Sequence, residues 1–191
     1  MTVMRSLGVP LTREMGRQAV GLRLDAVVRQ WYAEFRWQGA PPAEVEASIL
    51  DVVSRLILER AGPMPGAVEL VERLDDAGLA LAVASSSPLA LIRTVLDRLR
   101  LTGRFAVLHS AEKEPEGKPD PAVYRTAIGM LGVLPAQCVA FEDSLRGVLA
   151  AKRAGTMVVA VPDPAEATDP AFAVADIVLP SLEEFSLDRL E

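Results

Sequence analysis

The 191-residue sequence contains little of what several protein classes require. It has one cysteine and one histidine, so it has neither a disulfide framework nor a Cys/His zinc cluster. No apolar run approaches the roughly 20 residues that span a bilayer, and residues 1–14 lack the basic-then-apolar pattern of a signal peptide. The net charge of −6 disfavours binding to nucleic-acid phosphates, which requires clustered Lys and Arg. We therefore expect a soluble, cytoplasmic protein with no nucleic-acid or membrane partner. We also expect a monomer, although the sequence itself does not disclose the oligomeric state.

The N-terminal third of the chain is predicted to be helical. Half of all residues are hydrophobic and 24% are charged, which suits a folded chain of one domain, or one domain with a modest insertion. Apolar side chains recur at helical spacing over residues 24–35 and again over 43–62. The Pro- and Gly-containing stretch 61–68 then marks a boundary between two modules.

After this boundary, short apolar runs alternate with helical patterns. The apolar runs are bounded by turn residues and lie at 79–84, 105–110, 138–141, 156–161 and 176–179. Continuously apolar strands that alternate with helices indicate a parallel sheet covered on both faces. We therefore expect a doubly wound (Rossmann-like) α/β core with an N-terminal helical module. In such sheets ligands bind beyond the carboxyl ends of the strands.

Three groups of polar residues follow these strands, and each has an ordinary alternative explanation. Ser85 and Ser86 precede a helix, where hydroxyls and free N–H groups bind anions but also serve as simple caps. Lys118 lies between Gly117 and Pro119, where it is either a solvated surface residue or a rigidly presented ammonium suited to a phosphoryl group.

The third group is an acidic pair at the end of an apolar strand. Glu142 and Asp143 follow directly after the run CVAF. Two adjacent carboxylates repel each other, and Mg²⁺, which is commonly held by one or two carboxylates, would remove that repulsion. The alternative is a pair of acids stabilised by the dipole at a helix N-terminus.

Taken together, Ser85, Lys118 and the pair Glu142-Asp143 occur in an order that resembles the haloacid dehalogenase-like hydrolase superfamily. The segments LAVASSSPL, EGKPDP and CVAFEDSLRGVLAAKRAG look most like its branch of β-phosphoglucomutases and sugar-phosphate phosphatases. The segments SLGVPLT, GLRLDAVVRQWY and SAEKEPEGKPDP bring it closest to hexitol-phosphate or 2-deoxyglucose-6-phosphate phosphatases. The resemblance implies a helical cap over residues 1–62, a phosphatase core over 63–191, and a small phosphorylated sugar or sugar alcohol as substrate.

The resemblance also implies roles for individual residues. Ser85, the Ser86 amide and the catalytic Lys118 would hold the phosphoryl oxygens. The cofactor would be Mg²⁺, bound by Asp143 and, directly or through water, by Glu142. Arg23, near the start of a predicted cap helix, is a candidate for contacting the substrate, although an exposed arginine at a helix start is an equal alternative.

One element of the family pattern is missing from the sequence. Members begin catalysis with an aspartate in an apolar-DxDG segment at the end of the first, central strand, and no D-x-D pair occurs here. We expect that strand and its aspartate, which forms an aspartyl-phosphate, to lie upstream of Met1. A β-phosphoglucomutase-like phosphomutase remains an alternative. If the 191 residues are the true product, so does a non-catalytic remnant that binds a phosphosugar or a partner.

Two further residues are given structural roles from the sequence. His109 ends an apolar run, and no acidic partner for it can be identified, so we expect it to be structural. The aromatic residue Trp31 lies at helical spacing with its apolar neighbours, which favours core packing over a sugar-binding face.

Overall fold

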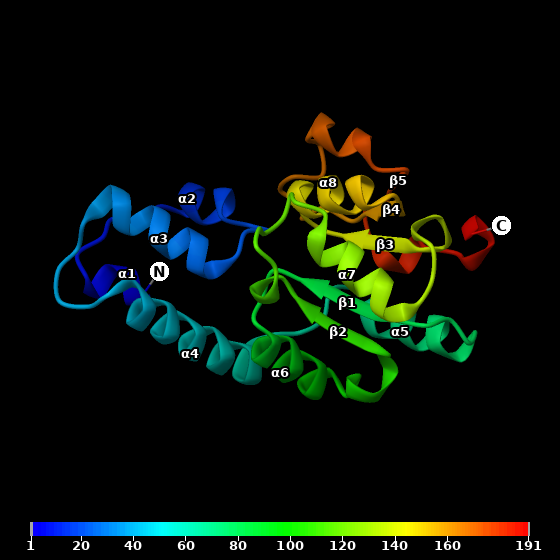
Figure 1. Cartoon of the computed structure of the whole chain (residues 1–191), viewed down its shortest axis with the longest axis horizontal. Coiled ribbons are helices and arrows are strands. Elements are labelled where there is room, and N and C mark those ends of the chain that lie inside the picture. The colour runs from blue at the N-terminus through cyan, green and yellow to red at the C-terminus, as the bar shows by residue number, and fades with distance from the viewer. Residues whose placement is uncertain (1, 191) are drawn as a thin grey trace.

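The computed structural model describes residues 2–190, which form a helical part and an α/β part (Figure 1). The helical part contains four helices: α1 (Thr2–Ser6), α2 (Arg13–Gln18), α3 (Leu24–Phe35) and α4 (Pro42–Arg60). The helix predicted over 24–35 is therefore confirmed, and the one predicted over 43–62 corresponds to α4. Pro42 occupies the first turn of α4, where proline's missing N–H has no helical partner to lose.

The helical part has an apolar core of its own. Met4, Val28, Trp37 and Val45 are buried in one cluster, against which Trp31 packs. The Trp37 ring meets Tyr32 edge-on with centroids 4.8 Å apart, and its indole N–H donates to the Ala40 carbonyl at 3.0 Å. These contacts lie within the helical part and hold its helices together without a contribution from the α/β part.

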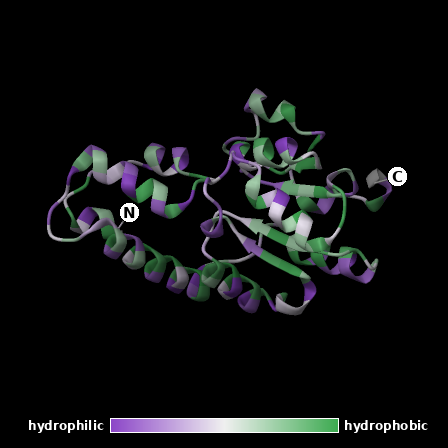
Figure 2. Cartoon of the chain, viewed as in Figure 1, coloured by the Kyte–Doolittle hydropathy of each residue, from purple (hydrophilic) through white to green (hydrophobic). Residues whose placement is uncertain are grey.

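The longest helix, α4, extends from the helical part to the side of α6 (Leu89–Leu99) (Figure 1). Hydrophilic residues recur along its whole length among the hydrophobic ones (Figure 2). In the part of the chain that the structure describes, no helix is both long enough and apolar enough to cross a membrane.

The α/β part contains all five strands expected from the sequence; the strand Val139–Glu142 is as long as its apolar run but begins one residue later, and the other four are shorter than their runs. The strands are β1 (Ala82–Ser85), β2 (Val107–Ser110), β3 (Val139–Glu142), β4 (Met157–Ala160) and β5 (Ile177–Val178). The other helices are α5 (Ala67–Asp76), α7 (Ala122–Leu131) and α8 (Leu145–Ala154), together with six short 3-10 turns: Thr102–Arg104, Ala111–Lys113, Pro135–Gln137, Pro170–Val174, Leu182–Glu184 and Leu187–Leu190. The prediction of an α/β fold with parallel strands is confirmed.

The strands form two separate parallel sheets. β1 pairs with β2, and β3, β4 and β5 pair in that order. Among the described residues, no strand pairs with the remaining edge of β1 or of β3. Helix α7 contacts β1, β2 and α8, and its buried residues share an apolar cluster with β3 and β4. The two sheets therefore lie against a common core although they share no backbone hydrogen bonds.

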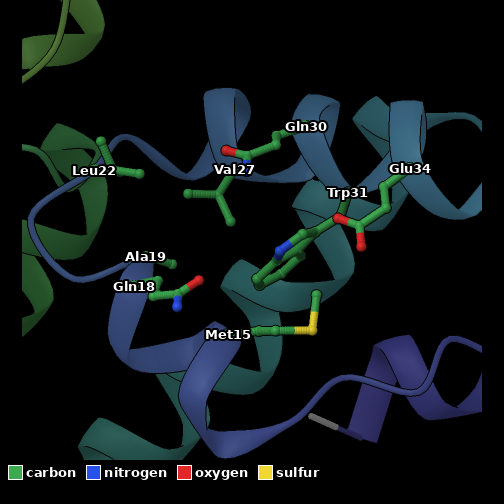
Figure 3. A pocket seen from close by; sticks show the side chains of 8 residues that line it. All are labelled: Met15, Gln18, Ala19, Leu22, Val27, Gln30, Trp31 and Glu34. Atoms are coloured by element: carbon green, nitrogen blue, oxygen red, sulfur yellow. The ribbon is translucent and has the colours of Figure 1, made fainter.

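One cavity lies entirely within the helical part. It measures about 160 Å³, and Met15 of α2 and Val27 and Trp31 of α3 point into it (Figure 3). Gln18, Gln30 and Glu34 complete its polar side. None of the residues singled out as phosphoryl or metal ligands lines this cavity, so the chemistry has to be sought elsewhere.

Candidate active site

The segment 20–23, just before α3, contacts the loops after β1 and β2 and the first turn of α8, which follows β3. The Ser86 hydroxyl, after β1, donates to the Gly21 carbonyl at 2.7 Å. Arg146, after β3, donates to the Val20 carbonyl at 3.2 Å. Arg23 donates to the Glu114 carbonyl, in the loop after β2, at 2.7 Å. The loops that carry the serines, Lys118 and the acidic pair therefore meet at one place, at the carboxyl ends of the strands.

Lys118 and Glu142 form a buried ion pair at this place. They are 7% and 8% exposed, and the Lys118 ammonium donates to Glu142 Oε1. The Tyr124 hydroxyl donates to the same oxygen, and the ammonium also lies 5.0 Å from the centre of the Tyr124 ring. A charge this deeply buried has to be paired. The pair joins two of the three motifs that the sequence singled out.

Asp143 is exposed, unlike its neighbour Glu142. Glu142 Oε1 is engaged by Lys118 and Tyr124, and its Oε2 accepts from the Ser144 hydroxyl at 3.5 Å. Within the described residues, no group of three or more potential His, Cys, Asp or Glu ligands surrounds a metal position. Mg²⁺ often takes only one or two carboxylates together with water and phosphate. The residues present fit such a site. The exposed Asp143 would bind the ion directly, and Glu142, whose oxygens already accept hydrogen bonds, would lie next to it.

The serine loop after β1 is held from two sides. The Ser85 hydroxyl accepts from the Ser87 amide at 3.1 Å, and the Ser110 hydroxyl donates to the Ser87 carbonyl at 2.7 Å. The Ser86 hydroxyl is already committed to the Gly21 carbonyl. A phosphoryl ligand would therefore find the backbone amide of Ser86, rather than its side chain, available as a donor.

Arg23 is 18% exposed at its side chain and is not the solvated arginine that was one alternative. Its guanidinium donates to both oxygens of Asp25, at 3.0 and 2.9 Å, and to the Glu114 carbonyl. Burial is the largest single influence and raises the pKa of Asp25, but the hydrogen bond and charge of Arg23, together with hydrogen bonds from Arg29 and the Ala26 amide, outweigh it and lower that pKa. The Arg23 stem lies over Gly117, where a Cβ would come within 3.0 Å of it. Arg23 thus connects the helical part to the loop that carries Lys118.

Comparison with known proteins identifies the family. The protein-family model of the haloacid dehalogenase-like hydrolases matches residues 6–155 of the chain. The chain belongs to this family. The chain is 40% identical to hexitol phosphatase B of Escherichia coli (strain K12) over 191 residues. This alignment covers 100% of the chain and 86% of the relative.

Two other comparisons bear on the choice of reaction. The hydrolase is 29% identical to β-phosphoglucomutase of Bacillus subtilis (strain 168) over 167 residues, or 83% of this chain and 72% of that one. The crystal structure of a mutant of CbbY from Rhodobacter sphaeroides, in complex with xylulose-(1,5)bisphosphate, aligns with a TM-score of 0.88 at 28% identity. This alignment covers 100% of this chain and 88% of that one.

Tyr124 is a residue of the hydrolase's site that sequence reasoning missed. Burial, followed by the charge of Glu142, raises the pKa of Tyr124 well above its usual range, so the phenol stays protonated and remains a donor. Tyr124 lies in the first turn of α7, six positions after Lys118. The only sequence signal was its place on the buried face of α7, next to Val123 and with Ala127 and Ile128.

We predict that Tyr124→Phe destabilises the protein by about 1.5–3 kcal/mol, because the substitution removes a buried hydrogen bond to a charged acceptor. Urea unfolding measures this free energy. Tyr32→Phe is the matched control, since Tyr32 packs edge-on against Trp37 and the ring remains; its effect should stay within about 0.5 kcal/mol. Equal losses in the two variants would contradict the role assigned to the Tyr124 hydroxyl.

The histidine at the end of β2 has an acidic partner that the sequence did not reveal. His109 is 8% exposed, and its Nε2 lies 2.6 Å from Glu114 Oε1. Hydrogen bonding to Thr126 and then to His109 lowers the pKa of Glu114, although burial acts in the opposite direction. The side chain of Glu114 therefore anchors the same loop whose carbonyl receives Arg23.

The lowered pKa of Glu114 predicts a specific pH dependence of stability. The stabilisation is complete above the unfolded-state pKa, about 4.5, and is lost as the pH falls through the lower folded-state pKa. Glu114→Gln should therefore flatten the decline in unfolding free energy as the pH falls below about 4.5. Glu116→Gln, at an exposed position of the same loop, is the control. Parallel curves for wild type and Glu114→Gln would refute the prediction.

Proposed function

We propose that this hydrolase is a Mg²⁺-dependent phosphatase acting on a small sugar or sugar-alcohol phosphate. The observation that carries the proposal is the buried contact between Lys118 and Glu142, in the same group of strand-end loops as Ser86. Similarity to a hexitol phosphatase over the full length of the chain supports a sugar-alcohol phosphate as substrate. The predominance of acidic over basic residues and the single cysteine support a cytoplasmic setting, and a monomer suffices for this site.

In this proposal, Ser85, the Ser86 amide and Lys118 bind the phosphoryl oxygens. The ammonium has three donors, so Lys118 can keep Glu142 as a partner while donating to a phosphoryl oxygen. Glu142 holds the ammonium in one position, because both side chains are buried and cannot reorient into water. This preorganisation makes the positive charge available where negative charge develops.

The metal would be held by Asp143, with Glu142 acting through a water molecule. Mg²⁺ bound there supplies positive charge that offsets the charge of the phosphoryl group. Ser144 keeps the acidic loop in place, because its hydroxyl caps α8 by accepting from the Gly147 amide at 3.1 Å. Arg23 remains the proposed contact to the substrate from the side of the cap.

We propose that the nucleophile is an aspartate of an apolar-DxDG segment upstream of Met1. Its strand would pair with the edges of β1 and β3 that no described strand occupies, and the 191 residues contain no D-x-D pair. The aspartate would attack phosphorus as the ester P–O bond breaks, and the second aspartate would protonate the leaving oxygen. Water would then hydrolyse the aspartyl-phosphate. Residues 1–62 would act as the cap that excludes bulk water over the core of residues 63–191.

The phosphomutase alternative has weaker support. The β-phosphoglucomutase relative is 29% identical, whereas the hexitol phosphatase is 40% identical and aligns over a longer part of the chain. The third possibility is a binding protein without turnover. It applies if the chain functions without a nucleophile.

The proposal is tested by phosphate release from a panel of sugar and sugar-alcohol phosphates with Mg²⁺. The 191-residue chain is compared with a chain extended by the in-frame upstream codons. We expect turnover only in the extended chain, with loss of turnover on removing Mg²⁺ or on Lys118→Met. Turnover by the 191-residue chain would overturn the assignment of the nucleophile. Dependence on a sugar bisphosphate primer, without net phosphate release, would favour the mutase.

A further inference from the structure

A second cavity lies between the helical part and the α/β part, next to the proposed phosphoryl site. It measures about 140 Å³. The helical part contributes Arg23, Asp25 and Glu46 of α4 to its wall, and the core contributes Ser86, Pro88 and Glu112. Because Ser86 belongs both to this wall and to the proposed phosphoryl site, the cavity is where the rest of a bound ester would extend.

The charges around the cavity sum to a negative wall. Arg23 and Arg29 share the single carboxylate of Asp25, to which Arg23 makes two hydrogen bonds and Arg29 an ion pair at 2.9 Å, so this group carries one net positive charge. Glu46 and Glu112 come from opposite sides of the cavity and add two carboxylates. Burial raises the pKa of Glu46, and the charge of Asp25 adds to this effect while Arg29 and Arg23 act against it.

We infer that Glu46 and Glu112 select an ester whose leaving group carries hydroxyls and no second phosphoryl group. The inference rests on the proposed phosphatase function and adds the chemical character of its substrate. Carboxylates accept strong hydrogen bonds from hydroxyl donors, which a polyol presents along its whole length. A second phosphoryl group would instead bring a charge near −2 against two like charges in a partly closed space.

The inference separates this chain from one of its structural neighbours. The CbbY structure holds xylulose-(1,5)bisphosphate, a substance with two phosphoryl groups. Because the carboxylates of Glu46 and Glu112 outnumber the one net positive charge of the neighbouring Arg23, Asp25 and Arg29, we expect this bisphosphate to bind poorly here. In proteins of the same fold, the charge of the cavity wall would thus determine which phosphate ester binds.

The experiment measures binding by titration calorimetry, so it does not depend on turnover. The 191-residue chain is titrated, in the presence of Mg²⁺, with inorganic phosphate, with a hexitol 6-phosphate and with xylulose 1,5-bisphosphate. We expect the hexitol phosphate to bind at least about tenfold tighter than the bisphosphate. Glu46→Gln and Glu112→Gln should each reduce that ratio at least about fivefold, with binding of inorganic phosphate unchanged. Glu44→Gln, an exposed position on the same helix, is the matched control and should leave all three affinities unaltered.

The outcomes distinguish the inference from the proposed function beneath it. If inorganic phosphate fails to bind, the phosphoryl site and the inference fall together. If phosphate binds but the bisphosphate binds as tightly as the hexitol phosphate, only the inference is wrong. It is also wrong if the two Glu→Gln variants, shown to be folded by thermal unfolding, keep the wild-type ratio.

Discussion

Gly147→Ala should displace the Glu142 carboxylate and destabilise the protein by about 1–3 kcal/mol or more. A Cβ at this buried position of α8 would lie 2.5 Å from Glu142 Oε1 and closer still to Cδ and Oε2. Helix α8 cannot move away cheaply, because Val148 and Ala151 beside this position are completely buried. Glu142 would have to leave its donors Lys118 and Tyr124, so the proposed phosphatase activity of the extended chain should fall with stability. Chemical denaturation and the phosphate-release assay measure the two effects.

Gly129→Ala is the matched control for this substitution. Gly129 also lies within a helix, α7, but a Cβ there meets nothing within 4 Å. The same change of residue should stabilise the protein by about 0.5–1 kcal/mol, because alanine restricts the unfolded chain and favours helix. If Gly147→Ala were as benign as Gly129→Ala, the close approach of Glu142 to α8 would be wrong.

Lys118→Met should cost about 3–5 kcal/mol of unfolding free energy, since it leaves the Glu142 carboxylate buried without its cation. The Tyr124 hydroxyl would remain as a donor, but a neutral donor does not compensate a buried charge. Lys113→Met is the control at an exposed position of the same loop region and should change stability by less than about 0.5 kcal/mol.

A double-mutant cycle with Glu142→Gln makes this prediction specific. In Lys118→Met/Glu142→Gln no charge is buried, so the double variant should recover a large part of the loss seen in Lys118→Met. Additive losses would show that the two side chains contribute independently. Phosphate binding should not recover in the double variant, because the ammonium proposed to contact the phosphoryl oxygens is gone.

Much of the fold follows from local sequence patterns. Helix α3 has the predicted bounds, and each of the five apolar runs overlaps a strand. Ser181 and Glu184 have the spacing of a capping box, which predicts a last helix, but Ser181 caps only the 3-10 turn Leu182–Glu184. Local capping chemistry was visible in the sequence there, but capping does not determine how far a helix continues.

The contacts that build the site are long-range and could not be derived from local patterns. The sequence placed Lys118 and Glu142 after strands, but their direct pairing depends on how β2 and β3 are arranged in space. Tyr124 looked like one more apolar position of a helix, and its hydroxyl acquires meaning only beside Glu142. His109 pairs with Glu114, five residues later in the chain, across a turn whose path the sequence alone does not specify.

The crossing of residues 20–23 over the strand-end loops has a consequence for how this chain can diverge. Two of its three contacts are made by the carbonyls of Val20 and Gly21, so they depend on the course of the main chain. Gly21 is constrained by its φ of +80° and by Ser144, whose Oγ would lie 2.9 Å from an added Cβ. Val20, which is 44% exposed, can change freely. The helical part can therefore accumulate substitutions, and with them new contacts to a ligand, while its contacts to the α/β part are kept.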